Sequence, residues 1–410
     1  MSQLESEVVA ELPVQPMLLP YLFHFRSNNG HTFILMPGRT YQLRLSGTLS
    51  QVAEQVLRRL DGQSTIPQVI EAVKADLAQT RPEMVIALVQ YLYKRGMLID
   101  GAAHLPDKLP EDGLARWERN LSFFGGFERS RFTRYDYQMA LQKAAVAILG
   151  LGGIGSWVAY ALATAGVGKI VGVDGDYVEL SNLNRQILYR PQDVGKSKTV
   201  VAQETLAAIA PEMEFVGLTS WMRGEEEVAK AIEGCDIVVL TADQPMGLIS
   251  RWTNRACFAL RIPLLASGMA SRWATIGPLY VPGLTGCWEC VDAQKRRQSK
   301  YYGEMFQTLA EHRAAAAPSL APMCAQVGGQ AAYEVVKYLT GFARPATLGC
   351  ELVTDTVTMQ VHKKAVKKQT GCVVCHVPPE AMPHQAARLP GVSSGNSLAR
   401  FANRFWGNDK

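Results

Sequence analysis

The chain has 410 residues and a mass of 45.0 kDa, which leaves room for more than one domain with a full hydrophobic core. Its net charge of +5, from 42 basic and 37 acidic residues, is too small and too dispersed to indicate a nucleic-acid partner. The N-terminus lacks the basic and apolar regions of a signal peptide, and no apolar run is long enough for a membrane helix, so we expect a cytoplasmic protein with no membrane partner.

Composition and periodicity divide the chain into segments. The predicted segments are an N-terminal extension (1–20), a small α+β domain (21–100), a linker rich in Pro, Asp and Gly (101–115), an α/β domain (116–377) and a flexible C-terminal tail (378–410).

The small domain is predicted from strands followed by amphipathic helices. The expected strands cover residues 21–26, 32–36 and 41–45, with a hairpin turn signal at 27–30. The expected helices cover residues 49–60, 66–77 and 82–94. Strands combined with three short helices are typical of a winged-helix module.

From about residue 144 the pattern changes to strands that alternate with helices. The expected strands cover 144–149, 169–173, 236–240 and 263–266, and late strands lie within 348–361. The expected helices cover 154–165, 196–210, 246–260 and 324–341. This alternation predicts a doubly wound, Rossmann-like, mostly parallel sheet with helices on both faces.

A glycine-rich turn joins the first strand of this domain to its first helix. The turn contains Gly150, Gly152, Gly153 and Gly155. Glycines in such a turn let backbone N–H groups approach a phosphate at the positive end of the helix dipole. Asp174 closes the next strand, where a carboxylate commonly binds ribose hydroxyls. Taken alone, the pattern predicts any nucleotide-binding Rossmann domain, and an NAD enzyme is the natural alternative.

The next residues favour a different chemistry. The run VDGDYVELSNLNRQ at 173–186, followed by VGKSK at 194–198, resembles the ThiF/MoeB-type superfamily, which includes the ubiquitin-activating enzymes. The resemblance implies an ATP-dependent adenylyltransferase that forms an acyl-adenylate and releases pyrophosphate. Adenylation needs cations that neutralise the departing pyrophosphate and a carboxylate that holds Mg²⁺.

The resemblance also implies roles for individual residues. Asn182, Arg185 and Lys198 match the phosphate contacts of the family, and Asp174 matches its ribose contact. Asp176 belongs to the same expected nucleotide site. Asp243 follows the strand at 236–240 and matches the magnesium aspartate of the family. The predicted catalytic residues are Asp243, Arg185, Lys198 and Arg119.

Arg119 is placed by a separate motif. Residues 116–120, Arg-Trp-Glu-Arg-Asn, resemble the short Arg-aromatic-x-Arg element of the family, which reaches into the ATP site of the partner subunit. The resemblance therefore implies that Arg119 acts in trans and that the protein is a homodimer. The alternatives are that the arginines of 128–134 serve this role or are simply solvated.

Two CxxC pairs, Cys287/Cys290 and Cys372/Cys375, lie far apart in the sequence. Four thiolates complete the tetrahedral coordination of Zn²⁺ and leave no position open for substrate. The pairs therefore predict a structural zinc site that ties the C-terminal segment to the α/β domain. A redox role for one pair is the alternative, and His376 is read as a bystander.

The remaining cysteines are predicted to be structural. Family members that form a thioester with a ubiquitin-like protein carry a cysteine in the region that corresponds to about 292–318, and this chain has none there. Cys324 lies just beyond that region, where the family generally has an apolar residue. We therefore expect no thioester chemistry.

Two further resemblances suggest the substrate. Residues 277–290, GPLYVPGLTGCWEC, resemble microcin C-type peptide adenylyltransferases, as do 242–245 and 321–322. Residues 43–48, with 57–62 and 96–99, resemble the PqqD-like recognition element, which binds a leader peptide as an added strand. The alternative is that this module only supports the dimer. Together they imply adenylation of a carboxylate on a ribosomally made precursor peptide, during biosynthesis of a microcin-type antibiotic. The activated group would be the C-terminal carboxylate or, as in pantocin-type enzymes, an Asp or Glu side chain.

Two other functions stay open. The enzymatic alternative is adenylation of the C-terminal glycine of a ubiquitin-like sulfur carrier in thiamin or molybdopterin biosynthesis. The non-enzymatic alternative is a nucleotide-sensing winged-helix regulator, although the predicted helices of the small domain lack the basic face of a DNA reader.

Overall fold

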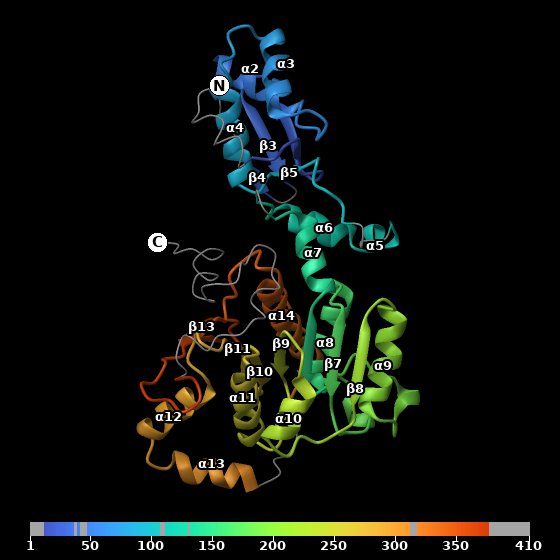
Figure 1. Cartoon of the computed structure of the whole chain (residues 1–410), viewed down its shortest axis with the longest axis vertical. Coiled ribbons are helices and arrows are strands. Elements are labelled where there is room, and N and C mark those ends of the chain that lie inside the picture. The colour runs from blue at the N-terminus through green and yellow to red at the C-terminus, as the bar shows by residue number, and fades with distance from the viewer. Residues whose placement is uncertain are drawn as a thin grey trace. The chain divides into compact units, whose positions relative to one another are not determined.

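The structure is a computed structural model that describes residues 12–36, 39–41, 47–106, 111–129, 132–311 and 318–376 (Figure 1). The chain forms two compact units, Met1–Met139 and Ala140–Lys410. Part of the expected third strand and of the PqqD-like motif, at residues 42–46, lies outside the described residues. The expected tail at 378–410 also lies outside them.

The N-terminal unit contains two small antiparallel sheets and a group of helices. One sheet pairs β2 (Phe23–Arg26), β3 (Thr32–Met36) and β4 (Arg39–Tyr41) in that order, and the other pairs β1 (Pro16–Leu18) with β5 (Leu98–Asp100). The helices are α2 (Gly47–Leu57), α3 (Ile66–Asp76), α4 (Pro82–Lys94), α5 (Glu111–Arg116), α6 (Glu118–Gly125) and most of α7 (Arg134–Gln142). The observed β2, β3 and α2–α4 lie where the sequence predicts them, whereas the β1–β5 sheet was not anticipated.

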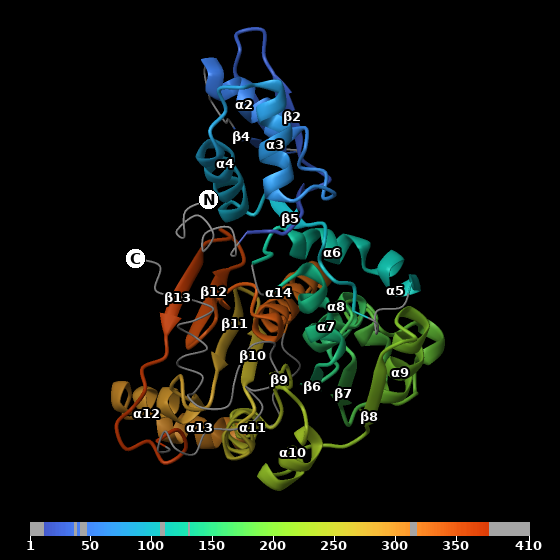
Figure 2. The ribbon, with the colours of Figure 1, turned by 45° about the horizontal axis from the view of Figure 1, so that its top comes forward.

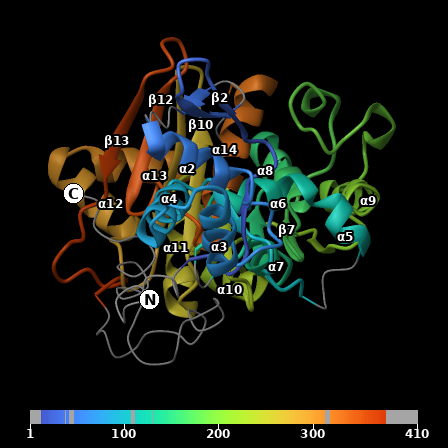
Figure 3. The ribbon, with the colours of Figure 1, turned by 90° about the horizontal axis from the view of Figure 1, so that it is seen from above.

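The core of this unit is built by the apolar faces of its first three helices. Figure 3 shows α2, α3 and α4 side by side. Val56, Val69 and Val89, one from each helix, are fully buried together with Ile34 of β3. This packing explains why short amphipathic helices are stable here, since isolated helices of this length are marginal in water.

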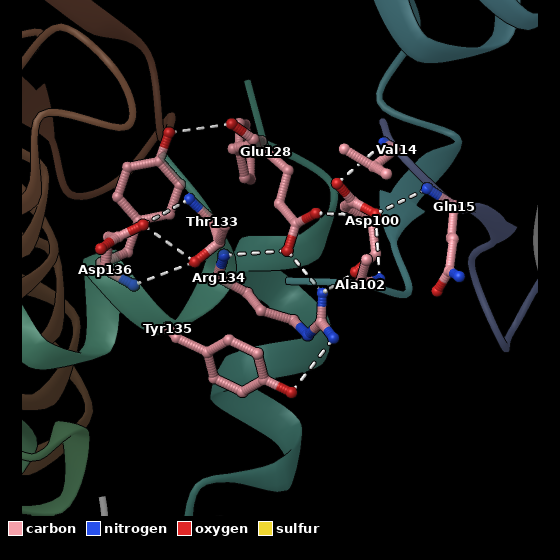
Figure 4. Close-up of polar contacts among 11 residues, drawn as sticks. Val14, Gln15, Asp100, Ala102, Glu128, Thr133, Arg134, Tyr135 and Asp136 are labelled. Atoms are coloured by element: carbon pink, nitrogen blue, oxygen red, sulfur yellow. Dashed lines mark hydrogen bonds and ion pairs between the residues drawn. The ribbon is translucent and has the colours of Figure 1, made fainter. Parts of the chain in front are cut away.

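A buried carboxylate connects β5 to the start of α7 (Figure 4). Glu128 accepts hydrogen bonds from the backbone N–H of Asp100 at 2.9 Å and from Nη1 of Arg134 at 2.7 Å. The carboxylate of Asp100 in turn accepts from the backbone N–H groups of Val14 and Gln15, both at 2.9 Å. These bonds make the segment after the expected linker part of the compact N-terminal unit.

Replacing Glu128 with alanine should destabilise this unit by about 3 kcal/mol, because the substitution leaves the guanidinium of Arg134, which is only 14% exposed, without its carboxylate partner. Urea denaturation of the full chain measures the loss, and amide hydrogen exchange should locate it at β5 and the start of α7. Glu118→Ala is the matched control, since the Glu118 side chain is 65% exposed and should cost under about 0.5 kcal/mol. Equal unfolding midpoints for the two variants would contradict the proposed role of Glu128.

The C-terminal unit is built on an eight-stranded sheet with the order β13-β12-β11-β10-β9-β6-β7-β8 (Figure 2). Its strands are β6 (Ala145–Leu149), β7 (Lys169–Val173), β8 (Glu214–Leu218), β9 (Ile237–Leu240), β10 (Leu264–Met269), β11 (Trp273–Tyr280), β12 (Cys350–Asp355) and β13 (Val361–Ala365). Strands β10, β9, β6, β7 and β8 are parallel, and β11, β12 and β13 extend one edge with antiparallel pairings.

Helices cover both faces of this sheet. The helices of this unit are α8 (Gly153–Ala165), α9 (Lys198–Ile209), α10 (Glu225–Ile232), α11 (Leu248–Leu260), α12 (Trp288–Gln298), α13 (Tyr302–Glu311) and α14 (Ala321–Thr340). Helix α8 packs against α9 and α14, whereas α10 packs against α11 and the opposite face of the central strands. The central strands are apolar on both faces, as buried parallel strands require. The predicted Rossmann-like α/β fold is confirmed.

The elements of this unit agree with the predicted ones to within a few residues, except that β8, β11, α10, α12 and α13 were not anticipated. Among the helices of the described residues, none has the length and hydropathy that a membrane span requires.

Candidate functional site

Three adjacent parallel strands end at the same level. Leu149, the last residue of β6, is in register with Val173 of β7 and with Leu240 of β9. The glycine turn follows β6, Asp174 follows β7, and Asp243 follows β9 within three residues. The connections from β6 and β9 run to opposite sides, which is the position where open α/β sheets bind ligands. The fold therefore gathers three predicted site elements at one edge.

Close packing explains two of the glycines in the turn. Gly150 has φ +97°, and a Cβ there would lie 2.7 Å from the backbone nitrogen of Ala242. A Cβ on Gly155 would lie 1.9 Å from the carbonyl oxygen of Gly150. Gly152 is different, because the only atom near its Cβ position among the described residues is Nε2 of Gln186, at 4.0 Å. Gly152 thus borders open space, where a phosphate can approach the backbone.

Asp174 is held beside this turn by backbone hydrogen bonds and by a lysine. Its carboxylate accepts from the N–H of Leu151 at 2.7 Å and from the N–H of Asp176 at 2.9 Å. The Lys198 ammonium lies 3.9 Å from Asp174 and donates to the carboxylate of Asp176 at 2.8 Å. Burial raises the pKa of Asp174, and the charge of Lys198 opposes this shift. A buried cation is thus placed next to two carboxylates at the strand ends.

Asn182 and Arg185 lie in the loop after Asp176. The side-chain oxygen of Asn182 accepts from the N–H of Glu179 at 3.1 Å, so part of this buried side chain shapes the loop. Arg185 donates from Nη1 to the carbonyl of Ser181 at 2.7 Å. The Arg185 Cδ also lies 3.6 Å from the Cβ position of Gly153, which places the arginine side chain against the glycine turn.

Asp243 is exposed at the end of β9. Its neighbour Ala242 donates from its backbone nitrogen to Leu149 at 2.8 Å, which anchors the loop to the β6 strand end. Within the described ranges, the Asp243 carboxylate has no hydrogen bond or ion pair to another residue. A solvated carboxylate at this position can hold Mg²⁺, which prefers oxygen ligands.

Two aromatic residues at the site were missed by the sequence analysis. Tyr189 donates from its hydroxyl to the carbonyl of Leu151 at 2.8 Å, and the Trp157 indole donates to the carbonyl of Arg185 at 3.1 Å. Burial raises the pKa of Tyr189, so the phenol stays a neutral donor. No periodicity connects Tyr189 with Leu151, because 38 positions separate them.

Cys324 packs underneath the turn. It is fully buried, its sulfur lies 3.6 Å from that of Met269, and a Cβ on Gly153 would lie 2.9 Å from the same sulfur. Burial raises the pKa of the Cys324 thiol, against the charge of Arg185. The thiol is therefore a packing group rather than an accessible nucleophile.

Arg119 belongs to the N-terminal unit. It lies on α6 with its side chain 89% exposed and 4.0 Å from the carboxylate of Glu118. An exposed guanidinium is consistent with a contact to another molecule, but its predicted action in trans stays a prediction.

The four predicted zinc ligands come together in the C-terminal unit. Cys287 precedes α12 and Cys290 lies in its first turn, whereas Cys372 and Cys375 follow β13. The sulfur atoms of Cys287 and Cys372 are 3.6 Å apart, and those of Cys290 and Cys375 are 3.4 Å apart. All four sulfur atoms lie within 4.8 Å of one another. Tetrahedral zinc with bonds of about 2.3 Å separates its sulfur ligands by about 3.8 Å, so this group fits a single ion.

Comparison with known proteins shows which family this chain belongs to. Residues 127–374 match the ThiF family. The chain belongs to the ThiF family. The ThiF chain is 29% identical over 268 residues to the molybdopterin-synthase adenylyltransferase of Escherichia coli, covering 65% of this chain and 98% of the relative. It is 30% identical over 240 residues to the E. coli sulfur carrier protein ThiS adenylyltransferase, covering 58% and 89%.

Solved structures share the fold of this ThiF-family chain. E. coli MccB with ATP and the microcin C7 biosynthetic enzyme MccB with N-formylated MccA each give a TM-score of 0.70 at 24% identity. In both cases 88% of this chain and 99% of the other chain are covered. The likeness extends beyond the residues that match the family.

Proposed function

We propose that this chain is an ATP-dependent adenylyltransferase that activates a carboxylate of a ribosomally made precursor peptide. The carboxylate oxygen would attack the α-phosphorus of ATP, the bond to the β-phosphate oxygen would break, and pyrophosphate would leave with the acyl-adenylate as product. The observation that carries the proposal is the shared level of the glycine turn, the Asp174–Lys198 pair and Asp243, within a family whose relatives are named adenylyltransferases.

Each residue at the strand ends would have a separate role. The backbone at Gly152 would receive the phosphates, and Lys198 and Arg185 would neutralise charge on the departing pyrophosphate. Asp174 would bind the ribose, with Asp176 holding Lys198 in place. Asn182 would complete the phosphate contacts. Asp243 would hold Mg²⁺, whose charge stabilises the leaving group.

The N-terminal unit would recognise the peptide. Some solved MccB structures contain MccA, in one case N-formylated, and we take this complex as the precedent for a peptide partner of this chain. In this chain β2 is an edge strand of its sheet, and its Phe23 and Phe25 are 61% and 45% exposed. An edge with exposed apolar side chains can accept a leader peptide as an added strand.

Three further assignments belong to this proposal. The four-cysteine group would hold a structural Zn²⁺ ion, since four thiolates leave no open position. The protein would act as a homodimer in which Arg119 reaches the partner's nucleotide. The product would be a modified peptide of the microcin type.

A second candidate is adenylation of a sulfur-carrier protein. It is favoured by the likeness to the molybdopterin-synthase and ThiS adenylyltransferases, because the match to this chain covers 98% and 89% of those two sequences. The exposed edge of the N-terminal unit favours the peptide, because a folded carrier has no need of a strand-accepting edge. If the chain were instead a nucleotide-sensing regulator, it should bind ATP and its promoter DNA but should not turn over ATP.

Pyrophosphate–ATP exchange tests the proposal. The chain, ATP and Mg²⁺ should exchange labelled pyrophosphate only when a short peptide encoded beside the gene is added, and mass spectrometry should show the adenylate or its product. Asp243→Ala should lower the exchange rate by at least about 100-fold. Without the carboxylate the Mg²⁺ ion is lost, and pyrophosphate is a poor leaving group when its negative charge is not neutralised. Glu226→Ala, an exposed carboxylate on α10, should leave exchange unchanged.

Each other outcome of this experiment has a meaning. Exchange driven by a ubiquitin-like carrier and not by any peptide would favour the second candidate. Exchange that survives Asp243→Ala would remove Asp243 from the mechanism. The absence of ATP binding would reject adenylation itself.

A further inference from the structure

The loop that carries Asp243 ends against an aromatic ring. Gly247 has φ +75° and directly precedes α11. A Cβ on Gly247 would lie 2.4 Å from Cε2 of Phe306, which is 9% exposed on α13. The Phe306 ring therefore rests on the backbone of Gly247, where only glycine fits.

Two guanidinium groups hold this ring in place. Arg251, one turn into α11, lies 4.6 Å from the centroid of Phe306, and Arg296 of α12 lies 5.8 Å from it. Arg251 also lies 5.4 Å from the ring of Trp288. A guanidinium group over an aromatic face is attracted electrostatically by the ring. The ring thus links α13 to both α11 and α12.

Carboxylates hold the two arginines over the ring. Arg296 donates from Nε to Asp292 at 2.7 Å. Arg251 lies 3.7 Å from Asp292 and 3.6 Å from Glu289. Asp292 is 5% exposed and the Glu289 side chain is 13% exposed, so the two carboxylates are largely withdrawn from solvent, whereas the Arg296 side chain is 42% exposed. The position of Phe306 is therefore set by three helices at once.

The loop between Asp243 and Gly247 is short and is held by backbone hydrogen bonds. Its start is anchored through the bond of Ala242 to β6, and the carbonyl of Pro245 accepts from the N–H of Ile249 at 3.0 Å. A shift of Gly247 therefore passes directly to Asp243, because few residues between them can absorb it. The contact of Phe306 with Gly247 supports the far end of this loop.

We propose that Phe306 is a positioning residue that fixes the Asp243 loop for Mg²⁺ binding. The inference rests on the proposed function, in which Asp243 holds the metal of ATP. Mg²⁺ demands near-ideal octahedral geometry with bonds of about 2.0–2.1 Å, so a small displacement of one carboxylate weakens it. Loss of the ring frees Gly247 and lets the carboxylate move, while the glycine turn and Lys198 stay in place.

Calorimetry on the full chain tests this role, with a non-hydrolysable ATP analogue titrated in the absence and presence of Mg²⁺. In Phe306→Ala, binding without Mg²⁺ should equal that of the natural chain, and the affinity for Mg²⁺ in the complex should fall about tenfold. Phe306→Tyr keeps the aromatic face and should restore Mg²⁺ affinity. Phe306→Leu keeps the apolar bulk but loses the aromatic face, so its Mg²⁺ affinity should lie between those of the alanine and tyrosine variants. The leucine variant therefore still tests the role of Phe306 if the alanine variant does not fold.

Matched variants separate the possible failures. Leu309→Ala, at a 37% exposed position on the same helix, should behave like the natural chain. Unchanged Mg²⁺ affinity in the alanine and leucine variants would overturn the role of Phe306. An equal loss with and without Mg²⁺ would also overturn it, because that pattern reports general unfolding. If Asp243→Ala binds Mg²⁺ normally, the assignment of Asp243 fails instead.

Discussion

Replacement of Cys290 by serine should remove the Zn²⁺ ion that we propose the four cysteines hold, and should lower the midpoint of thermal unfolding by about 10 °C. Serine cannot supply the thiolate that completes a tetrahedral site, and three remaining thiolates bind the ion far more weakly. The cysteines connect the start of α12 to the segment after β13, so loss of the ion frees both. For a unit of this size the midpoint of unfolding falls by about 2–4 °C for each kcal/mol of unfolding free energy that is lost, so a loss of about 3 kcal/mol corresponds to this shift.

Metal analysis and calorimetric scanning check this result on the same samples. Cys350→Ser is the matched control, since Cys350 is half-buried on β12 and lies outside the four-cysteine group. The control should keep one zinc per chain. A Cys290→Ser protein that keeps its metal and its unfolding midpoint would show that the four thiols do not form a zinc site.

Gly155→Ala should destabilise the C-terminal unit by about 3 kcal/mol and abolish ATP binding. The added Cβ would lie 1.9 Å from the carbonyl oxygen of Gly150 and 2.7 Å from Oγ1 of Thr241. Gly150 and Thr241 directly follow β6 and β9, and the Thr241 hydroxyl donates to the carbonyl of Gly150 at 2.7 Å, so neither atom can move away cheaply. The turn must open, and the backbone N–H groups that would face the phosphates must leave their positions.

Gly152→Ala separates folding from binding at the same turn. Its φ of −75° is negative, as alanine requires, and among the described residues the one atom near the Cβ position is Nε2 of Gln186, at 4.0 Å. Unfolding should therefore change by under about 0.5 kcal/mol, whereas ATP affinity should fall about tenfold because the methyl group occupies the path of the phosphate. Urea denaturation and calorimetry measure the two quantities. Equal effects of both variants on stability would contradict this account of the turn.

The strands around the turn were predictable because their patterns are local. Runs such as 145–149 and 237–240 are short and apolar at every position, which is typical of a strand buried on both faces. The glycines mark the turn because each needs space or a positive φ. Elements with polar positions, such as β8 and α10, lacked that contrast and were not anticipated.

The sequence also indicated the metal group, because CxxC spacing carries its own geometry. Two thiolates three residues apart can reach one ion, and two such pairs leave it fully coordinated. That Cys287 lies 3.6 Å from Cys372 depended on β13 returning the chain to the start of α12, which spacing does not encode.

The sequence by itself determined the Rossmann-like fold, the glycine turn and the identity of the four cysteines, since local periodicity and fixed spacing specify each. Only the tertiary structure brought Tyr189 to Leu151 and Cys324 beneath Gly153, and only it placed Phe306 against Gly247. These contacts join residues far apart in the chain. They depend on how helices pack across a finished sheet, and no pattern within a single segment carries that information.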